Sequence, residues 1–411
     1  MLTNIEYKNY NKKDDIHGTV LYPAVMVAPI QKKILNNIIS KENISSVFDP
    51  FHGSGTALYE AFEISPDINL IGCDINPFAN LITTVKLQGV TKLIKKDIDS
   101  IEAYTKHPPK KKINFSFPNI KKWLRNDIIE SLALLRMAIM KIKSKRNRLY
   151  LWYILADIIR YNSNTRSSTY KLHIKNKNDI ENIENKIIDD FIAAAKKHYV
   201  KFQKKSKYFT LYKDDTIRKI KKFNKNSFDI SITSPPYGDN STTVPYGQFS
   251  MLPLYTIPES DLNLKGWELS NYSIIDNHSM GGSDKKNILS NYEISLIKYY
   301  LDNISNPKIK KIERFFKDYF YFLKELCRVT KKYIVLTLGN RTVDRINVDL
   351  VSITKKYLRK NGFECIGSAK RAIPRKRTPK LTSNVNKKPV SSMNFEYIII
   401  YKKKSPQKKK K

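Results

Sequence analysis

The chain has 411 residues, and 75 Lys and Arg against 38 Asp and Glu give it a formal net charge of +37. This excess argues against a generic small-molecule enzyme and favours a polyanionic partner, most often nucleic acid and less often an anionic membrane. The chain is also rich in Lys, Asn and Ile, as an AT-rich genome would produce, so lysines that only solvate the surface remain an alternative.

Several other classes are disfavoured by the same arithmetic. The three cysteines, Cys73, Cys327 and Cys365, form no C-x-x-C pair, and their odd number suits a reducing cytosol. The six histidines show no metal-ligand spacing with them. No apolar run reaches transmembrane length, and the N-terminal residues lack the apolar region of a secretory signal. We therefore expect a cytoplasmic protein with neither a membrane partner nor a metal.

Residues 1–91 predict the first part of an α/β core. After a polar start, residues 19–39 are apolar, with a proline-bearing turn and then a helical pattern. Two strand–turn–helix units follow, which is how a parallel sheet begins. Their predicted strands are 45–51 and 69–75, and their predicted helices are 56–64 and 76–86.

The alternation stops at residue 92. Residues 92–206 are basic and mostly helical in pattern, with Leu/Ile periodicity over 119–142, 148–160 and 180–203. A polar stretch at 162–171 interrupts them. We interpret 92–206 as a helical insertion and a candidate DNA-recognition region.

The core resumes over 207–239, with strands at 208–212 and 228–233 and a short helix near 215–223. Residues 240–308 form a second insertion, whose part 240–290 is rich in Ser, Asn, Thr, Gly and Pro. That composition predicts a long functional loop, a candidate for target recognition. The C-terminal part of the core, 309–404, contains helices near 309–330 and 347–361 and strands at 333–340, 363–371 and 395–403, before a basic tail at 405–411.

The pattern gives seven strands, and the last two have no helix between them, so they should pair antiparallel. Six parallel strands and one antiparallel strand near the C-terminus resemble the class I methyltransferase fold. The fold class that we expect is therefore α/β, with a Rossmann-like, mostly parallel seven-stranded sheet and a largely helical insertion.

The segment DPFHGSGTALYEA (49–61) contains the first chemical signal. A strand leads into a turn of Gly53, Ser54 and Gly55, and the next helix begins at Thr56, an arrangement that brings backbone N–H groups close to a ligand. Leu58 stands where a dinucleotide fingerprint needs its third glycine, so a pyrophosphate cofactor is disfavoured. An ordinary glycine-rich turn is the alternative.

Two further strand ends carry candidate residues. Asp74 ends the second strand twenty-one residues after Gly53, which places it to bind both ribose hydroxyls of a nucleoside, although a helix cap is the alternative. Residues 234–237 read Ser-Pro-Pro-Tyr after a buried strand, and a Pro-Pro step holds its carbonyls stiffly. An ordinary proline turn is the alternative for that tetrapeptide.

Three segments together resemble the amino-methyltransferases of DNA, which methylate exocyclic amines of cytosine or adenine with S-adenosylmethionine: DPFHGSGT (49–56), GCDINPFA (72–79) and TSPPYGD (233–239). They match the family's motifs I, II and IV, and LYPAVMVAP (21–29) looks like motif X. Asp215, fourteen residues before Asp229, matches the acidic residue that contacts the adenine amine of the cofactor. The resemblance implies a cofactor site formed by Pro23, Asp49, Phe51, Gly53, Ser54, Gly55, Thr56, Asp74, Asn76 and Asp215. His52 is variable in that pattern and receives no role.

The resemblance also implies a catalytic loop, Ser234, Pro235, Pro236 and Tyr237. The Ser234 hydroxyl and the Pro235 carbonyl would accept the hydrogens of the target amine, and Tyr237 would stack on the base after it flips out of the duplex. Serine at the first position favours cytosine N4 over adenine N6. An RNA guanine-N2 methyltransferase and an inactive nucleic-acid-binding scaffold are the alternatives. The expected partner is double-stranded DNA, with a restriction endonuclease as a possible companion.

Basic residues between the last two strands give a final expectation. The strand at 363–371 should end at the same edge of the sheet as the catalytic loop, so the segment after it would emerge beside the site. We expect it to hold DNA phosphates through Arg371, Arg375, Lys376, Arg377 and Lys380.

Overall fold

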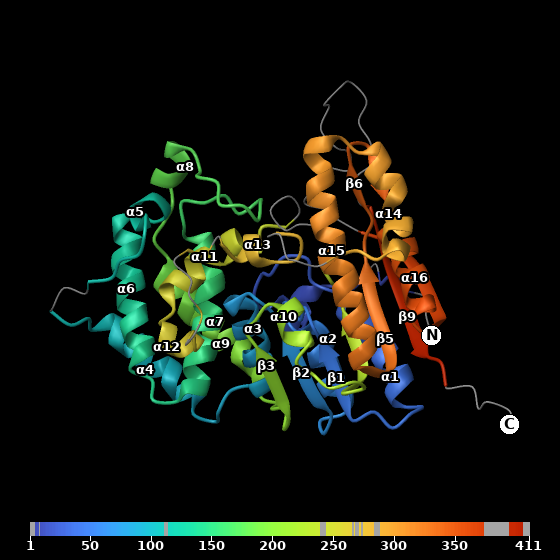
Figure 1. Ribbon diagram of the computed structural model, residues 1–411. Coiled ribbons are helices and arrows are strands. Elements are labelled where there is room, and N and C mark those ends of the chain that lie inside the picture. Colours follow the sequence, from blue (N-terminus) through green and yellow to red (C-terminus); the bar gives the residue numbers. More distant parts are fainter. Residues whose placement is uncertain are drawn as a thin grey trace, which may run out of the picture.

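The computed structural model describes residues 5–7, 9–110, 114–238, 244–264, 267, 271–272, 274–282, 288–373 and 394–405 (Figure 1). One mixed sheet organises this chain, in the order β3-β2-β1-β4-β5-β9-β8. Its strands are β1 Ser46–Asp49, β2 Asn69–Cys73, β3 Phe209–Tyr212, β4 Phe228–Thr233, β5 Thr330–Leu338, β8 Phe363–Ala372 and β9 Phe395–Lys403.

The sheet confirms the seven predicted strands and their directions. All neighbours pair parallel except around β9, which is antiparallel to both β5 and β8. The mostly parallel α/β architecture is therefore the one that the strand pattern predicts. β1 and β4 are buried along their whole length, as expected for central strands covered on both faces.

Two hydrophobic layers cover the two faces. Alternate residues of β1 belong to different layers: Val47 lies in one and Phe48 in the other, where Phe48 stacks on Phe228 with ring centres 4.4 Å apart. The Val47 layer includes α1 (Ala28–Ile39), α2 (Thr56–Ile64) and α3 (Pro77–Gln88). The Phe48 layer includes α10 (Thr216–Ile220), α15 (Asn306–Val329) and α16 (Leu350–Lys360).

The region 92–206 is helical, as predicted, and its apolar residues belong to the same core as α1 to α3. Its longest helix, α7 (Lys145–Tyr161), buries Tyr150, Trp152 and Tyr153 almost completely. The other helices are α4 Ile94–Lys106, α5 Ile120–Trp123, α6 Asn126–Met140, α8 Lys177–Glu181 and α9 Ile187–His198. The insertion therefore extends the sheet's own core.

The region 240–308 differs from the predicted loop, because its described part contains helices. They are α11 Tyr246–Thr256, α12 Glu259–Leu262, α13 Ile274–His278 and α14 Asn291–Asn303. Helix α11 contains Gly247 and Pro253 and is buried on several sides, including Phe249 and Leu252. A buried helix shows no alternation between an apolar and a polar face, so glycine and proline produced a turn-like signal instead.

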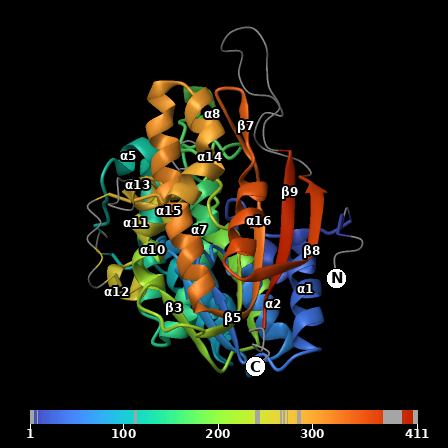
Figure 2. The ribbon, with the colours of Figure 1, turned by 45° about the vertical axis from the view of Figure 1, so that its right-hand side comes forward.

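A short hairpin that the sequence did not predict follows β5. Strands β6 (Arg341–Val343) and β7 (Ile346–Val348) pair antiparallel, and Asp344 and Arg345 form its tip with φ of 47° and 66°. Hairpin turns of this kind normally use Asn and Gly, which explains why the sequence signal was missing. The hairpin, α14 and the adjoining part of α15 rise beyond the end of β5 in both ribbon views (Figures 1 and 2). None of the described helices is both long and apolar enough to cross a membrane.

Candidate active site

The candidate site begins where the chain reverses direction across the sheet. From β1 the chain proceeds outward to β2 and β3 and then returns to β4 on the other side of β1. Ligands of open α/β sheets bind at such a switch point, outside the carboxyl ends of the strands. Here the Thr233 hydroxyl, at the end of β4, donates to Oδ1 of Asp49, at the end of β1, over 2.6 Å. The DPFHGSG and SPPY segments therefore meet.

Asp49 is fully buried, and one of its oxygens is available. Oδ1 also accepts from the backbone N–H of Phe51 at 3.1 Å, whereas Oδ2 has no hydrogen-bond partner among the residues that the structure describes. Burial raises the pKa of this carboxyl to about 7. A buried carboxylate oxygen without a partner is rare in proteins and fits a ligand with a donor group, such as the ammonium of an amino acid.

The glycine turn has the conformation that its sequence predicts. Gly53 and Gly55 have φ of 49° and 72°, in the left-handed region that side chains disfavour. A methyl group at Gly55 would lie 2.5 Å from Oγ1 of Thr83. The turn leads directly into α2, whose first residue, Thr56, is buried. The backbone can thus approach a ligand closely at the start of this helix.

Asp74 lies beside this turn. Its Oδ2 accepts from the N–H of Gly53 at 2.9 Å, and its Oδ1 accepts from the N–H of Asn76 at 2.8 Å. Burial raises its pKa, and the nearby His52 opposes that shift. Each carboxylate oxygen can still accept a second hydrogen bond, which is the capacity that ribose hydroxyls would need. Binding of ribose by Asp74 stays a prediction.

Asn76 has a different environment from the one implied by the motif. It is 1% exposed; its Oδ1 caps α3 by accepting from Phe78 N–H at 2.9 Å, and its Nδ2 donates to Oγ of Ser250 at 2.8 Å. The residue before a helix is often recruited as its cap, and here the cap occupies the amide. These contacts hold Asn76 in place after Asp74, and its predicted contact with the cofactor stays a prediction.

The N-terminal segment covers the glycine turn through Tyr22, a residue of the predicted motif X segment that was not among the expected contacts. Tyr22 is 4% exposed, and its ring lies 3.5 Å from where a Cβ of Gly53 would stand. Its hydroxyl accepts from Nδ2 of Asn76 at 3.3 Å. Pro23, the predicted cofactor residue, is buried next to it.

His52 was also missed, because its position in the motif is variable. It is 2% exposed, with Nδ1 3.0 Å from both the carbonyl oxygen of Gly53 and Oγ1 of Thr83. Its Nε2 lies 3.3 Å from Oδ1 of Asn80. Through these contacts His52 helps to hold the glycine turn.

The other predicted cofactor residues surround the same turn. The hydroxyls of Ser54 and Thr56 lie 3.4 Å apart, and the Phe51 and Phe322 rings have centres 5.0 Å apart. Asp215 caps α10 by accepting from Ile217 N–H at 3.0 Å. The Thr216 hydroxyl donates to the carbonyl of Pro50, which places Asp215 beside the DPFHGSG segment.

The SPPY segment is folded back on itself. Oγ of Ser234 lies 2.8 Å from the hydroxyl of Tyr237, and Pro235 is buried. Burial and the nearby Glu396 carboxylate raise the pKa of Tyr237 well above its usual value, so its hydroxyl keeps its proton. A methyl group at Gly238 would lie 1.9 Å from Nη1 of Arg341. The hairpin residue Arg341, which no sequence motif marks, therefore packs directly against the backbone of this loop.

Arg371 corrects the expectation for the basic segment. It lies within β8, is 6% exposed, and its Nη1 is 2.8 Å from Oε2 of Glu396, its register partner on β9. Arg371 is thus a strand residue, within the predicted bounds 363–371, and it already has an anionic partner. The other predicted phosphate contacts, Arg375, Lys376, Arg377 and Lys380, lie outside the described residues.

Comparison with known proteins gives a consistent result. No family model matches the chain. The Type II methyltransferase M.MvaI of Kocuria varians is 28% identical to it over 411 residues, covering 93% of this chain and 89% of that protein. The Type II methyltransferase M.MjaII of Methanocaldococcus jannaschii is 36% identical over 88 residues, covering 21% of this chain and 16% of that protein. The chain is thus similar to a Type II methyltransferase over nearly its whole length.

Proposed function

We propose that the protein is a site-specific DNA methyltransferase of a restriction–modification system. It transfers a methyl group from S-adenosylmethionine to the exocyclic amine of a flipped base, and cytosine N4 is the favoured target. The observation that carries the proposal is the hydrogen bond between Thr233 and Asp49, which joins the segments proposed to bind the methyl donor and the target base at the switch point. The similarity to M.MvaI over 93% of the chain supports the same conclusion.

The residues around the glycine turn fit this cofactor. The unpartnered oxygen of Asp49 suits the ammonium of its methionine part, and Asp74 suits the ribose. The predicted contacts Pro23, Phe51, Ser54, Gly55, Thr56 and Asp215 lie around the same turn. When bound, the cofactor supplies a methyl group activated by a positively charged sulfur.

The SPPY segment accounts for the other half of the reaction. The amine nitrogen is a poor nucleophile because its lone pair is delocalised into the ring. If Ser234 and Pro235 accept its two hydrogens, the nitrogen becomes more tetrahedral and attacks the methyl carbon. The C–N bond would form as the C–S bond breaks with its electron pair left on the sulfur, and the methylated amine would then release one proton to water. Since a serine oxygen can accept two hydrogen bonds, Ser234 can contact the amine while it remains paired with Tyr237.

Target recognition is proposed for the regions 92–206 and 240–308 and for the segment after β8. Basic helices in 92–206 would hold phosphates, and residues near the SPPY loop would contact bases. Arg341 adds a guanidinium at that loop, contributed by the hairpin.

The experiment is methyl transfer from labelled S-adenosylmethionine to duplex DNA and, separately, to RNA, followed by nucleoside analysis. We expect N4-methylcytosine in DNA only. N6-methyladenine would correct the target base, and methylguanine in RNA would contradict the DNA assignment. The variant Tyr237→Ala is the comparison with reduced methyl transfer, and Tyr299→Ala, which changes a tyrosine that is 64% exposed, is its matched control.

A further inference from the structure

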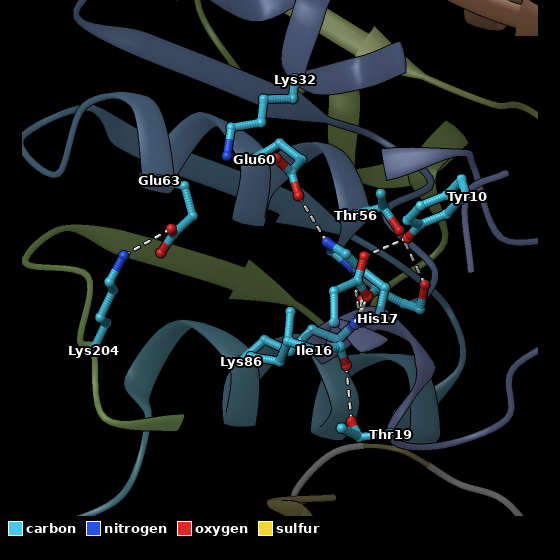
Figure 3. Close-up of polar contacts among 12 residues, drawn as sticks. Tyr10, Ile16, His17, Thr19, Lys32, Thr56, Glu60, Glu63, Lys86 and Lys204 are labelled. Carbon is cyan, nitrogen blue, oxygen red and sulfur yellow. Dashed lines mark hydrogen bonds and ion pairs between the residues drawn. The ribbon is translucent and has the colours of Figure 1, made fainter. Parts of the chain in front are cut away.

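Three ionisable side chains are buried behind the glycine turn. His17 belongs to the 3-10 turn η2 (Ile16–Gly18), Glu60 to α2 and Lys86 to α3. They are 3%, 6% and 2% exposed, respectively. Figure 3 shows His17 between the other two side chains. Neither the predicted cofactor contacts nor the SPPY chemistry uses any of them.

The contacts form one continuous chain. Nζ of Lys86 donates to the carbonyl oxygen of Ser54 at 2.7 Å and lies 3.2 Å from Nδ1 of His17. Nε2 of His17 lies 2.9 Å from Oε1 of Glu60. An ammonium only donates, so Nδ1 of His17 is the acceptor and Nε2 carries the ring proton toward Glu60. The donor direction therefore runs from Lys86 through His17 to Glu60.

The burial of Lys86 needs a reason, since taking an ammonium out of water is costly. An apolar side chain could pack α3 against α2 and η2, but it could not bind the Ser54 carbonyl. That carbonyl lies between Gly53 and Gly55, which both have left-handed backbone conformations and little intrinsic rigidity. Lys86 supplies the external contact that fixes the orientation of the peptide between them.

His17 connects this contact to the N-terminal segment. It lies five residues before Tyr22, which covers Gly53. The same segment is attached to α7 through the backbone N–H of Leu21, which donates to Oδ1 of Asp157 at 2.9 Å. The turn and the segment that covers it thus share one buried polar connection.

We propose that Lys86 is a positioning residue for the cofactor turn, and that His17 and Glu60 hold Lys86 in place while linking the turn to the N-terminal segment. The inference rests on the proposed function, because it assumes that S-adenosylmethionine binds at this turn. We call Lys86, His17 and Glu60 the relay. The consequence of this proposal is that the relay controls affinity for the cofactor rather than the rate of methyl transfer.

The charges around the relay predict how it responds to pH. Burial and the neighbouring Lys12 lower the pKa of Lys86 to about 7, against the opposing carboxylates of Asp15 and Glu60. Burial lowers the pKa of His17, and the nearby charges of Lys86, Lys12 and Lys32 lower it further. The imidazole ring therefore stays neutral. Above pH 7 Lys86 therefore loses its proton and its hydrogen bond to Ser54 weakens. Glu60 and Asp49, whose pKa values burial raises to about 7, gain their charges in the same range. The contribution of Lys86 is therefore the difference in cofactor affinity between the unmodified protein and a variant without this lysine.

The first test is Lys86→Met, studied by calorimetry with S-adenosylhomocysteine, which is not consumed. We expect affinity to fall by about tenfold, the order of one hydrogen bond to a charged group, while kcat at saturating cofactor stays the same. Lys92→Met, at an exposed lysine just after α3, is the matched control. Unchanged affinity in Lys86→Met, or loss of kcat alone, would overturn the inference. Failure of the unmodified protein to bind would instead contradict the proposed function.

A second pair of variants keeps Lys86 and tests the contacts of the two His17 ring nitrogens, Nδ1 and Nε2, one at a time. The amide oxygen of His17→Asn can replace Nδ1 and accept from Lys86. The longer side chain of His17→Gln reaches Glu60 instead, so that Lys86 keeps the Ser54 carbonyl but loses the acceptor that His17 supplies. We expect the Asn variant to bind more tightly than the Gln variant. We also expect the advantage in cofactor affinity of the unmodified protein over Lys86→Met to shrink as the pH rises above 7, since ionisation of Asp49 is common to both proteins. Equal affinities of the two His17 variants, together with parallel pH profiles, would show that the cluster only stabilises the fold.

Discussion

The two sides of the candidate site are constructed differently. On the cofactor side, Asp49, Gly53 and Asp74 belong to two consecutive strand–turn units. The carboxylates of Asp49 and Asp74 accept from backbone N–H groups that lie 2 to 21 residues away in sequence. On the target side, Ser234 and Tyr237 bond to each other, but Gly238 is packed by Arg341, about a hundred residues further along the chain. A short motif can therefore describe the first side, whereas the second side depends on the fold.

This difference predicts that the cofactor side is the more sensitive to backbone change. Gly55→Ala places a methyl group 2.5 Å from Oγ1 of Thr83 at a φ of 72°. Strain of up to about 3 kcal/mol should weaken S-adenosylhomocysteine binding by roughly 100-fold in calorimetry. Thr83→Ala in the same chain should recover part of the affinity, because it removes the clash but not the backbone strain. Near-normal binding by Gly55→Ala would show that the turn does not approach the cofactor.

On the target side, the largest effect should come from Tyr237. Tyr237→Ala removes a stacking surface worth about 1–3 kcal/mol per base, so methyl transfer should fall roughly 10- to 100-fold while cofactor binding is retained. Tyr237→Phe keeps the ring but removes the hydroxyl that pairs with Ser234. An intermediate rate for the Phe variant would assign separate contributions to stacking and to the hydrogen bond. A fully active Ala variant would contradict the assignment of the catalytic loop.

The sequence predicts the features that depend on neighbouring residues and misses those that depend on the fold, as in the two sides of the candidate site. The seven strands were found because buried apolar runs between turn signals are local features, and the glycine turn was found because positive φ selects glycine. Helix α11 was missed because Pro253 and its burial hide the helical period. Arg341, Lys86 and His17 were missed because each reaches its partner only after the chain folds, and no local spacing marks them. Arg371, the last residue of the predicted strand 363–371, was counted among the phosphate contacts because its ion pair with its register partner, Glu396, appears only in the folded sheet.

A smaller effect should arise where the hairpin contacts the loop. Gly238→Ala would force the Arg341 guanidinium away, since its Cβ would lie 1.9 Å from Nη1. We expect methyl transfer to fall by about tenfold, as for other displaced groups beside a reacting centre. Adding Arg341→Ala should restore part of the rate if the fault is the clash. Equal and additive decreases in this double-mutant cycle would instead show that the two residues act independently.

The smallest expected effect concerns the basic segment after β8, and it distinguishes a DNA contact from solvated surface. Because β8 is parallel to β4 and ends at the same edge of the sheet, the segment leaves the sheet on the side of the SPPY loop. Arg375→Ala with Arg377→Ala should weaken duplex binding several-fold for every sequence alike and reduce the salt slope by roughly 0.9 for each phosphate that the protein no longer neutralises. Lys41→Ala with Lys225→Ala is the matched control, since these exposed lysines follow α1 and precede β4, at the opposite edge of the sheet and outside the proposed DNA-binding regions. The measurement is a binding titration with duplex DNA at low and high salt. The same salt slope for the two double variants would mean that the segment holds no phosphate. Cofactor affinity should be unchanged in both double variants.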